Sequence, residues 1–157
     1  MKAKEYLSQL EQLDQKIKHK KQELIEAKRN RGISTAGTET GKIQTTLAGS
    51  SGKQTESQAL KVVSLEEIIE SQIIEYMELK HKYIDQIHDL KDGLYIDVLY
   101  RRYIRGEKNF TQIACDMGYS YKHIINKHGE ALIAFEKSHQ DLFENEAVTD
   151  GKLMEKF

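Results

Sequence analysis

The chain has 157 residues with 24 basic and 25 acidic side chains, no proline and no tryptophan, a composition that suits long helices with solvated faces better than sheets. No apolar run approaches the roughly 20 residues of a membrane-spanning helix, and the charged, amphipathic first residues are not those expected of a signal peptide. The single cysteine, Cys115, cannot form an internal disulfide, so we expect an all-α cytoplasmic protein, of one domain or two small ones, without a membrane partner.

Residues 1–30 are predicted to form one long helix. Apolar or small residues recur along it at alternating steps of three and four, which is the spacing of a coiled-coil seam. These residues are Ala3, Tyr6, Leu10, Leu13, Ile17, Leu24 and Ala27. Lys20 occupies the remaining place in the series, where its charge lowers stability but can fix register or oligomeric state.

Residues 31–63 hold half of the ten glycines and many serines and threonines, and we expect a flexible linker there because they bury little apolar surface. A second long helix is predicted for residues 64–91, with Ser64 and Glu67 as a capping box at its start. Its seam runs through Leu65, Ile69, Gln72, Tyr76, Leu79, Tyr83, Ile87 and Leu90.

The two long helices carry opposite net charge. Residues 1–31 have nine basic and five acidic side chains, a net +4, whereas residues 64–92 have three basic and eight acidic, a net −5. The simplest interpretation is that the helices lie against each other, either as a helical hairpin in one chain or as a coiled coil between the chains of a homodimer or higher oligomer. The sequence does not decide between the hairpin and the coiled coil. An alternative explanation of the charge is that the basic first helix contacts nucleic acid.

Residues 92–137 are predicted to form a small module that begins with a supporting helix. Asp92 and Gly93 interrupt the preceding seam, and Gly106 is expected to stop the supporting helix. The residues expected on one side of this helix are Leu94, Val98, Leu99 and Tyr103.

The stretch from residue 110 to residue 132 has the pattern of a helix-turn-helix, in which two short helices cross steeply over a tight turn. Ala114 supplies the small residue inside the first helix, Gly118 the turn residue that tolerates positive φ, and Ile124 the branched residue that packs back from the second helix. The alternative interpretation is an ordinary helical hairpin in a bundle. Such a hairpin would not usually need a small residue, a turn glycine and a branched residue at these positions.

Capping and core residues support the same boundaries. Ser120 can accept backbone N–H bonds as N-cap of the second helix, and Asn109 with Gln112 offers the first helix a start similar to a capping box. Ile113 and Met117 are expected to fill the inner face of the first helix.

The block from residue 90 to residue 135 resembles region 4 of bacterial sigma factors. The matching pieces are Val98-Leu99, Arg102-Tyr103, Gly106, Gln112-Ile113-Ala114, Met117-Gly118-Tyr119-Ser120, Ile124 and Ala131-Leu132. The full order of parts is more similar to phage-encoded regulators of the ArpU/RinA type, and this resemblance covers residues 60–136 best. It implies a regulator of phage or prophage late genes that binds double-stranded DNA.

The chain also departs from the sigma pattern. Gln112 stands where sigma region 4 usually has an acidic residue before Ile-Ala, and the rest of a sigma factor is missing. Residues 93–137 carry seven basic and five acidic side chains, and a net +2 is weak for a DNA-binding module because phosphate neutralisation supplies most non-specific affinity. Dimerisation through the long helices would present two modules.

The second helix of the motif is the expected recognition helix, over residues 120–134. With Ile124 inward, steps of 100° place Lys122, His123 and Asn126 on the opposite side and Lys127 on a flank. Lys122 could donate to guanine and Asn126 could pair with adenine in the major groove.

Phosphate contacts are expected around this helix. Ser120 and the first helical N–H groups could hold a phosphate, and Tyr121 could touch a phosphate or a thymine methyl group. Phosphate candidates on the supporting helix are Arg101, Arg102 and Arg105.

Each of these residues also has a purely structural interpretation. Lys122 and Asn126 fit a solvated face, and Arg102 fits an internal ion pair equally well. His128, Leu132, Ala131 and Phe135 fall on the core side, where we expect His128 to be half-buried; Tyr103 and Tyr119 are also expected in the core. Glu130 lies outward and would repel phosphate.

Three functions compete: a sequence-specific transcriptional regulator, a phage small terminase-like subunit that recognises packaging sites, and a coiled-coil protein that contacts RNA polymerase without reading DNA. An enzyme is not expected, because no catalytic set of side chains, cofactor motif or metal-ligand spacing occurs. Cys115 is expected to be a partly buried structural thiol, His81 and His88 to be solvated, and the acidic tail, residues 138–157, to fray.

Overall fold

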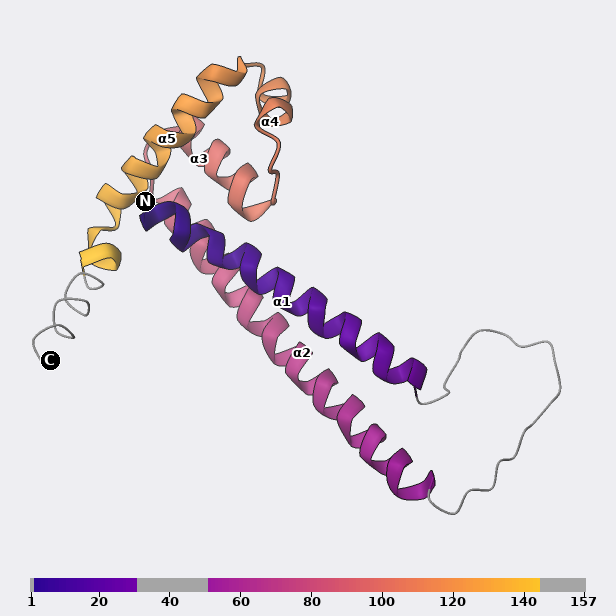
Figure 1. The fold of residues 1–157 in the computed structure, drawn as a ribbon. Coiled ribbons are helices and arrows are strands. Elements are labelled where there is room, and N and C mark those ends of the chain that lie inside the picture. The colour runs from indigo at the N-terminus through magenta and orange to yellow at the C-terminus, as the bar shows by residue number, and fades with distance from the viewer. Residues whose placement is uncertain (1, 31–50, 145–157) are drawn as a thin grey trace, which may run out of the picture. The chain divides into compact units, whose positions relative to one another are not determined.

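The computed structural model describes residues 2–30 and 51–144, and all regular elements in these ranges are helices (Figure 1). The all-α prediction is therefore confirmed for this part of the chain. The elements are α1 (Lys2–Asn30), α2 (Ser51–His88), α3 (Gly93–Leu99), the π-helix η1 (Tyr100–Ile104), α4 (Phe110–Met117) and α5 (Tyr121–Ser138). The chain divides into two units, Leu13–Tyr76 and Met1–Gln12 with Met77–Phe157.

The unit Leu13–Tyr76 is a helical hairpin within one chain. The part of α1 in this unit runs antiparallel to α2, because Lys28 near the end of α1 pairs with Glu66, with 3.0 Å between Nζ and Oε1. The seam between them buries Ile17, Leu65 and Ile69, as the periodicity predicts. The opposite charges of the two helices thus meet as expected, although an ion pair exposed to this extent contributes little stability.

The second helix starts at Ser51, so the predicted start at Ser64 is wrong. Residues 51–63 belong to the helix rather than to the linker, and Ser64 lies inside it, where no capping box can form. The physical reason is that Val62, three positions before Leu65, is buried and extends the seam backwards. The remainder of the predicted linker, residues 31–50, lies outside the described residues.

In the other unit, aromatic side chains join the start of α1 to the end of α2. Tyr83 of α2 is fully buried, its hydroxyl donates to the carbonyl of Tyr6 at 2.8 Å, and the two ring centroids lie 4.8 Å apart. Burial raises the pKa of Tyr83 far above its usual range, so this hydroxyl stays protonated. Leu7, which the predicted seam omits, is fully buried in the same unit.

The segment after α5 is ordered further than predicted. Phe143 is buried, its ring lies 5.8 Å from that of Tyr6 and 6.4 Å from that of Phe135, and Lys2 donates to its carbonyl oxygen. The imidazole of His139 is also buried against Phe135. The prediction of a frayed tail from residue 138 is therefore wrong up to residue 144, because two aromatic rings find apolar partners, and residues 145–157 lie outside the described part.

Short helices follow the break after α2 as expected. Asp92 caps α3 by accepting the Leu94 N–H at 2.9 Å, and Val98, Leu99 and Tyr103 are buried. The supporting helix then widens into the π-helix η1, where the Arg105 N–H donates to the carbonyl of Tyr100, five residues back, at 3.0 Å. It ends at Gly106, whose φ of 72° is left-handed.

Candidate nucleic-acid interface

The turn between α4 and α5 has the geometry that the helix-turn-helix pattern predicts. Gly118 has a φ of 75°, and the Tyr119 N–H donates to the carbonyl of Ala114 at 2.9 Å, a bond that ends α4 as in a Schellman motif. Ala114, Ile113 and Ile124 are buried together with Val98 of α3. Partly buried side chains packed against this core are Leu94, Phe110 and Met117.

Side-chain caps fix where both motif helices begin. Asn109 Oδ1 accepts from the N–H groups of Thr111 at 3.0 Å and Gln112 at 3.3 Å, and Ser120 Oγ accepts from the N–H of His123 at 3.2 Å. Both predicted N-caps are confirmed. The reciprocal half of the capping box is absent, because the Gln112 side chain donates to Asp116 Oδ1 instead, at 2.8 Å.

The N-terminal part of α5 presents a polar face to solvent. Lys122 and Asn126 are exposed while Ile124 is fully buried, so the predicted sides are confirmed for these three residues. Tyr121 is also exposed, and His123 is half-buried. Four predicted contact residues are thus exposed together at this end of α5, namely Ser120, Tyr121, Lys122 and Asn126.

Tyr119 lies beside this face and not in the core, so that prediction is wrong. It directly follows the left-handed Gly118, in the turn and outside both helices, and nearly half of it is exposed. Its ring stacks on that of His123, with 4.9 Å between centroids and 25° between planes. The pair forms a flat aromatic edge next to Ser120.

Lys127 forms an ion pair within its own protein. Its Nζ lies 2.8 Å from Glu130 Oε2, which also accepts from the Tyr95 hydroxyl at 2.8 Å. The hydrogen bond from Lys127 lowers the pKa of Glu130 most, and the bond from Tyr95 lowers it further. The bond between Lys127 and Glu130 also raises the pKa of Lys127. The structure therefore does not place Lys127 with the other predicted contacts, and the charge of Glu130 is partly balanced.

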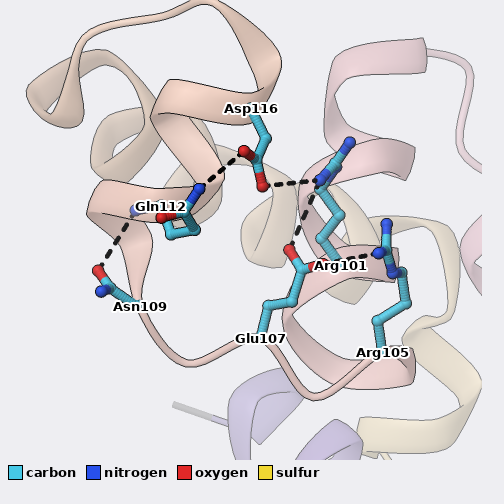
Figure 2. A network of polar contacts seen from close by, with 6 residues as sticks. All are labelled: Arg101, Arg105, Glu107, Asn109, Gln112 and Asp116. Atoms are coloured by element: carbon cyan, nitrogen blue, oxygen red, sulfur yellow. Dashed lines mark hydrogen bonds and ion pairs between the residues drawn. The ribbon is translucent and has the colours of Figure 1, made fainter.

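The arginines after α3 are held by carboxylates (Figure 2). Arg101 Nη1 lies 3.6 Å from Glu107 Oε2 and 3.7 Å from Asp116 Oδ2, and Arg105 Nη2 lies 3.1 Å from Glu107 Oε1. Figure 2 shows how this network, continued by Gln112, ties η1 to the following loop and to α4. Arg105 keeps about half of its side chain exposed, whereas Arg101 is mostly covered.

Arg102 points to a different part of the same unit. Its Nη1 lies 3.8 Å from Glu11 Oε2, its guanidinium lies 5.1 Å from the ring centre of Tyr103, and its side chain is mostly buried. Of the two interpretations of Arg102, the internal ion pair is the one seen here. Lys108 pairs with the same carboxylate.

His128 is half-buried on the core side of α5, as predicted. Its Nε2 lies 3.0 Å from the Tyr103 hydroxyl, its ring stacks on Tyr103, and the ring of Phe110 meets it edge-on at 4.9 Å. Burial lowers the pKa of His128 to about 4, helped by the charges of Arg102 and Lys4. Burial also raises the pKa of Tyr103 to about 12, so both partners are neutral at pH 7.

Several residues of this region were not identified from the sequence. Glu107, Asp116 and Glu11 pair with predicted contact arginines, and Tyr95 donates to Glu130, the partner of Lys127. Only Asp116 had a local signal, since it lies four positions after Gln112 on one helix face. Cys115 is exposed, contrary to prediction, because the buried side of α4 is occupied by Ile113 and Ala114.

Two further observations concern residues 2–30 and 51–144. In these ranges no group of three or more His, Cys, Asp or Glu side chains lies where it could hold a metal ion. Nor does any helix there combine the length and apolar character that crossing a membrane requires.

Comparison of the chain with models of protein families, with curated proteins and with solved structures finds no match. Function is therefore inferred from the geometry of the two motif helices and their surroundings.

Proposed function

We propose that this protein is a sequence-specific DNA-binding regulator of transcription, with α5 as its recognition helix. The observation that supports the proposal most directly is the exposed face of Lys122 and Asn126 at the start of a helix that is packed and capped as in a helix-turn-helix. The left-handed glycine turn and the two side-chain caps fix the tight turn and the start of each helix, and the packing of Ala114 against Ile124 holds the pair as a helix-turn-helix requires.

The chemistry of this face suits the major groove. The N-terminal part of a recognition helix contacts base edges, where a lysine donates to the acceptors of guanine and an asparagine pairs bidentately with adenine. Ser120 uses its oxygen to cap α5, so its hydroxyl hydrogen and the first N–H groups of the helix remain to bind a phosphate. Tyr121 and His123 flank these groups and contact phosphate or a thymine methyl group.

The arginines contribute unequally in this proposal. Arg105 is half-exposed and reaches phosphate directly, whereas Arg101 and Arg102 must first leave Asp116, Glu107 or Glu11. A single module with a net charge of +2 binds weakly at physiological salt, so we propose that a homodimer or higher oligomer presents two modules. The resemblance to ArpU/RinA-type regulators supports phage or prophage late genes as targets. RNA polymerase is a second candidate partner.

The test is a gel shift of the full chain on upstream fragments from its own genetic neighbourhood, with competitor DNA and a salt series. We expect one fragment to resist competition, and the variant Lys122→Ala/Asn126→Ala to lose this specificity while its far-UV circular dichroism is unchanged. Lys137→Ala, which removes a lysine from the exposed end of the same helix, is the matched control and retains specific binding.

Two results would contradict the proposal. Specific binding that survives the double substitution would show that the face of Lys122 does not read DNA. Absence of any shift at low salt would favour the protein-interaction function, and RNA polymerase would then be the first partner to test by co-purification.

A further inference from the structure

The helix α2 carries a second seam on the side that faces away from α1. Four large apolar side chains of this helix are between 50% and 71% exposed, namely Leu60, Val63, Ile74 and Met77. They belong to a series with alternating steps of four and three, which we name the outer seam: Glu56, Leu60, Val63, Glu67, Glu70, Ile74, Met77 and His81. Every member of this series is exposed.

The spacing of the outer seam is that of a coiled coil, and its position follows from the helix itself. α2 is one uninterrupted helix, so at 100° per residue Val63 and Ile74 lie within about 20° of each other. The inner seam of Val62, Leu65 and Ile69 is centred about 135° away around the same helix, at 100° per residue. An exposed apolar stripe with heptad spacing is typical of a helix that packs against another helix.

We infer that the outer seam binds the outer seam of a second copy of this chain, with the two α2 helices antiparallel. The order of residues is symmetric about the point between Ile68 and Ile69. Antiparallel pairing therefore sets Leu60 opposite Met77 of the second copy and Val63 opposite Ile74 of the second copy, each twice. Such self-complementarity is what a twofold symmetric interface requires.

The end residues of the outer seam, Glu56 and His81, favour antiparallel over parallel pairing of the two α2 helices. Antiparallel pairing sets Glu56 opposite His81 of the second copy, whereas parallel pairing in register sets each of these residues against itself. Both side chains are exposed, and the imidazole of His81 lies 3.5 Å from the carboxylate of the exposed Asp85. Antiparallel pairing thus keeps the two Glu56 carboxylates apart and sets each beside an imidazole that can donate a hydrogen bond, which favours the antiparallel dimer.

The centre of the outer seam limits how tightly the copies bind. Glu67 stands opposite Glu70 of the second copy in this arrangement, again twice, so four carboxylates face one another between the two sets of apolar pairs. Like charges at facing positions weaken association. The expected dimer is therefore reversible and dependent on concentration and salt.

This dimer deepens the proposed function by naming the surface through which two copies associate. Its test does not depend on DNA binding, because the interface involves α2 alone and is measured without DNA. Sedimentation velocity of the full chain over a concentration series should show a monomer–dimer equilibrium. Val63→Asp/Ile74→Asp should abolish the dimer, and Glu67→Gln/Glu70→Gln should lower the dissociation constant several-fold. Ile68→Asp is the matched control, since Ile68 is 41% exposed on the same helix but outside the outer seam, and it should leave the dimer intact.

Cross-linking tests the orientation. In a Cys115→Ser background, which removes the exposed native thiol, an equal mixture of Val63→Cys and Ile74→Cys should form disulfide-linked dimers, and neither variant should do so alone. Each variant then carries a single cysteine, so any disulfide must join two chains.

The inference is overturned by any of three results. A chain that stays monomeric at high concentration has no such interface, and if Val63→Asp/Ile74→Asp then also increases protease cleavage of residues 31–50, the outer seam is covered by the chain's own linker. Cross-linking of the single variants alone would show parallel pairing. A dimer that Ile68→Asp disrupts as strongly as Val63→Asp/Ile74→Asp would place the interface elsewhere.

Discussion

At the scale of single residues, two glycines that look alike in the sequence have opposite roles. Gly118 has a left-handed φ of 75°, whereas Gly129 lies inside α5, and a Cβ added at either position would meet nothing within 4 Å. The cost of a side chain at Gly118 is therefore backbone strain alone, without a steric clash. At Gly129 an added methyl group removes backbone freedom from the unfolded chain and favours the helix.

We predict that Gly118→Ala lowers the free energy of unfolding by about 1 to 2 kcal/mol, the cost of left-handed backbone for an L-residue. Gly129→Ala should raise it by up to about 1 kcal/mol. Urea denaturation of the two variants measures both values. If the two substitutions shift stability in the same direction, the tight turn at Gly118 is not the conformation in solution.

His128 makes stability depend on pH. Its pKa is about 4 in the folded chain and about 6.5 when unfolded, so the unfolded state binds more protons between these values. Stability is fully present above pH 6.5 and is lost as the pH falls toward 4, by roughly 1 to 2 kcal/mol once solvent screening of a half-buried group is allowed for.

The measurement is the free energy of unfolding between pH 4 and 7 for the wild type and for His128→Gln. The substitution should flatten the curve in this range. His19→Gln, at an exposed position of α1, should leave the slope of the wild type, and a slope that persists in His128→Gln would assign it to other groups.

At the scale of elements, Ser120 serves α5 as a cap and, in the proposed function, serves DNA as a phosphate contact. The two roles separate in two variants. Ser120→Ala should lower the free energy of unfolding by about 1 kcal/mol because the His123 N–H loses its acceptor. Ser120→Asp should retain the cap and the stability, yet lose DNA affinity because a carboxylate then faces the phosphate. Equal DNA binding by wild type and Ser120→Asp would remove Ser120 from the interface.

Local sequence signals predicted the helices and caps of the motif well, but not the ion pairs with distant residues or the π-helix beside it. Gly118, Asn109, Ser120 and the period of α5 act within a few residues, and all were interpreted correctly. The pairing of Arg102 with Glu11 joins positions far apart in the chain, so no local pattern reveals that this arginine is engaged. The π-helix η1 likewise depends on packing and not on an apolar period.

The limits of the long helices were predicted less accurately for a related reason. Ser51 and Gly52 have the composition of a linker, but α2 already extends through them because Val62 and Leu65 bury one face further along. Helix propagation costs little once a packed turn exists. The prediction from composition therefore put the start of α2 too late. The apolar seam of α2 was predicted correctly.

At the scale of the whole molecule, the two proposals assign separate tasks to separate helices. Val63→Asp/Ile74→Asp should abolish the dimer and weaken DNA binding by losing the second module, whereas Lys122→Ala/Asn126→Ala should lose specific DNA binding and keep the dimer. Sedimentation and gel shifts on the same preparations measure both. The salt dependence of the residual binding should also become less steep in the monomeric variant, because fewer phosphates are contacted.

Other results would show whether the dimer and DNA binding are independent. Unchanged DNA affinity in a proven monomer would show that one module suffices, and would leave the dimer without a part in DNA binding. Loss of the dimer in Lys122→Ala/Asn126→Ala would mean that the two surfaces are coupled.

The exposure of Cys115 has a practical consequence. It is the chain's only cysteine and lies on α4, so a maleimide fluorophore attaches at a single known place without any engineered substitution. The dye would sit on the first motif helix and not on the proposed reading face of α5. Its anisotropy on titration with an unlabelled oligonucleotide would report association in real time, and its emission would reveal whether α4 approaches the duplex.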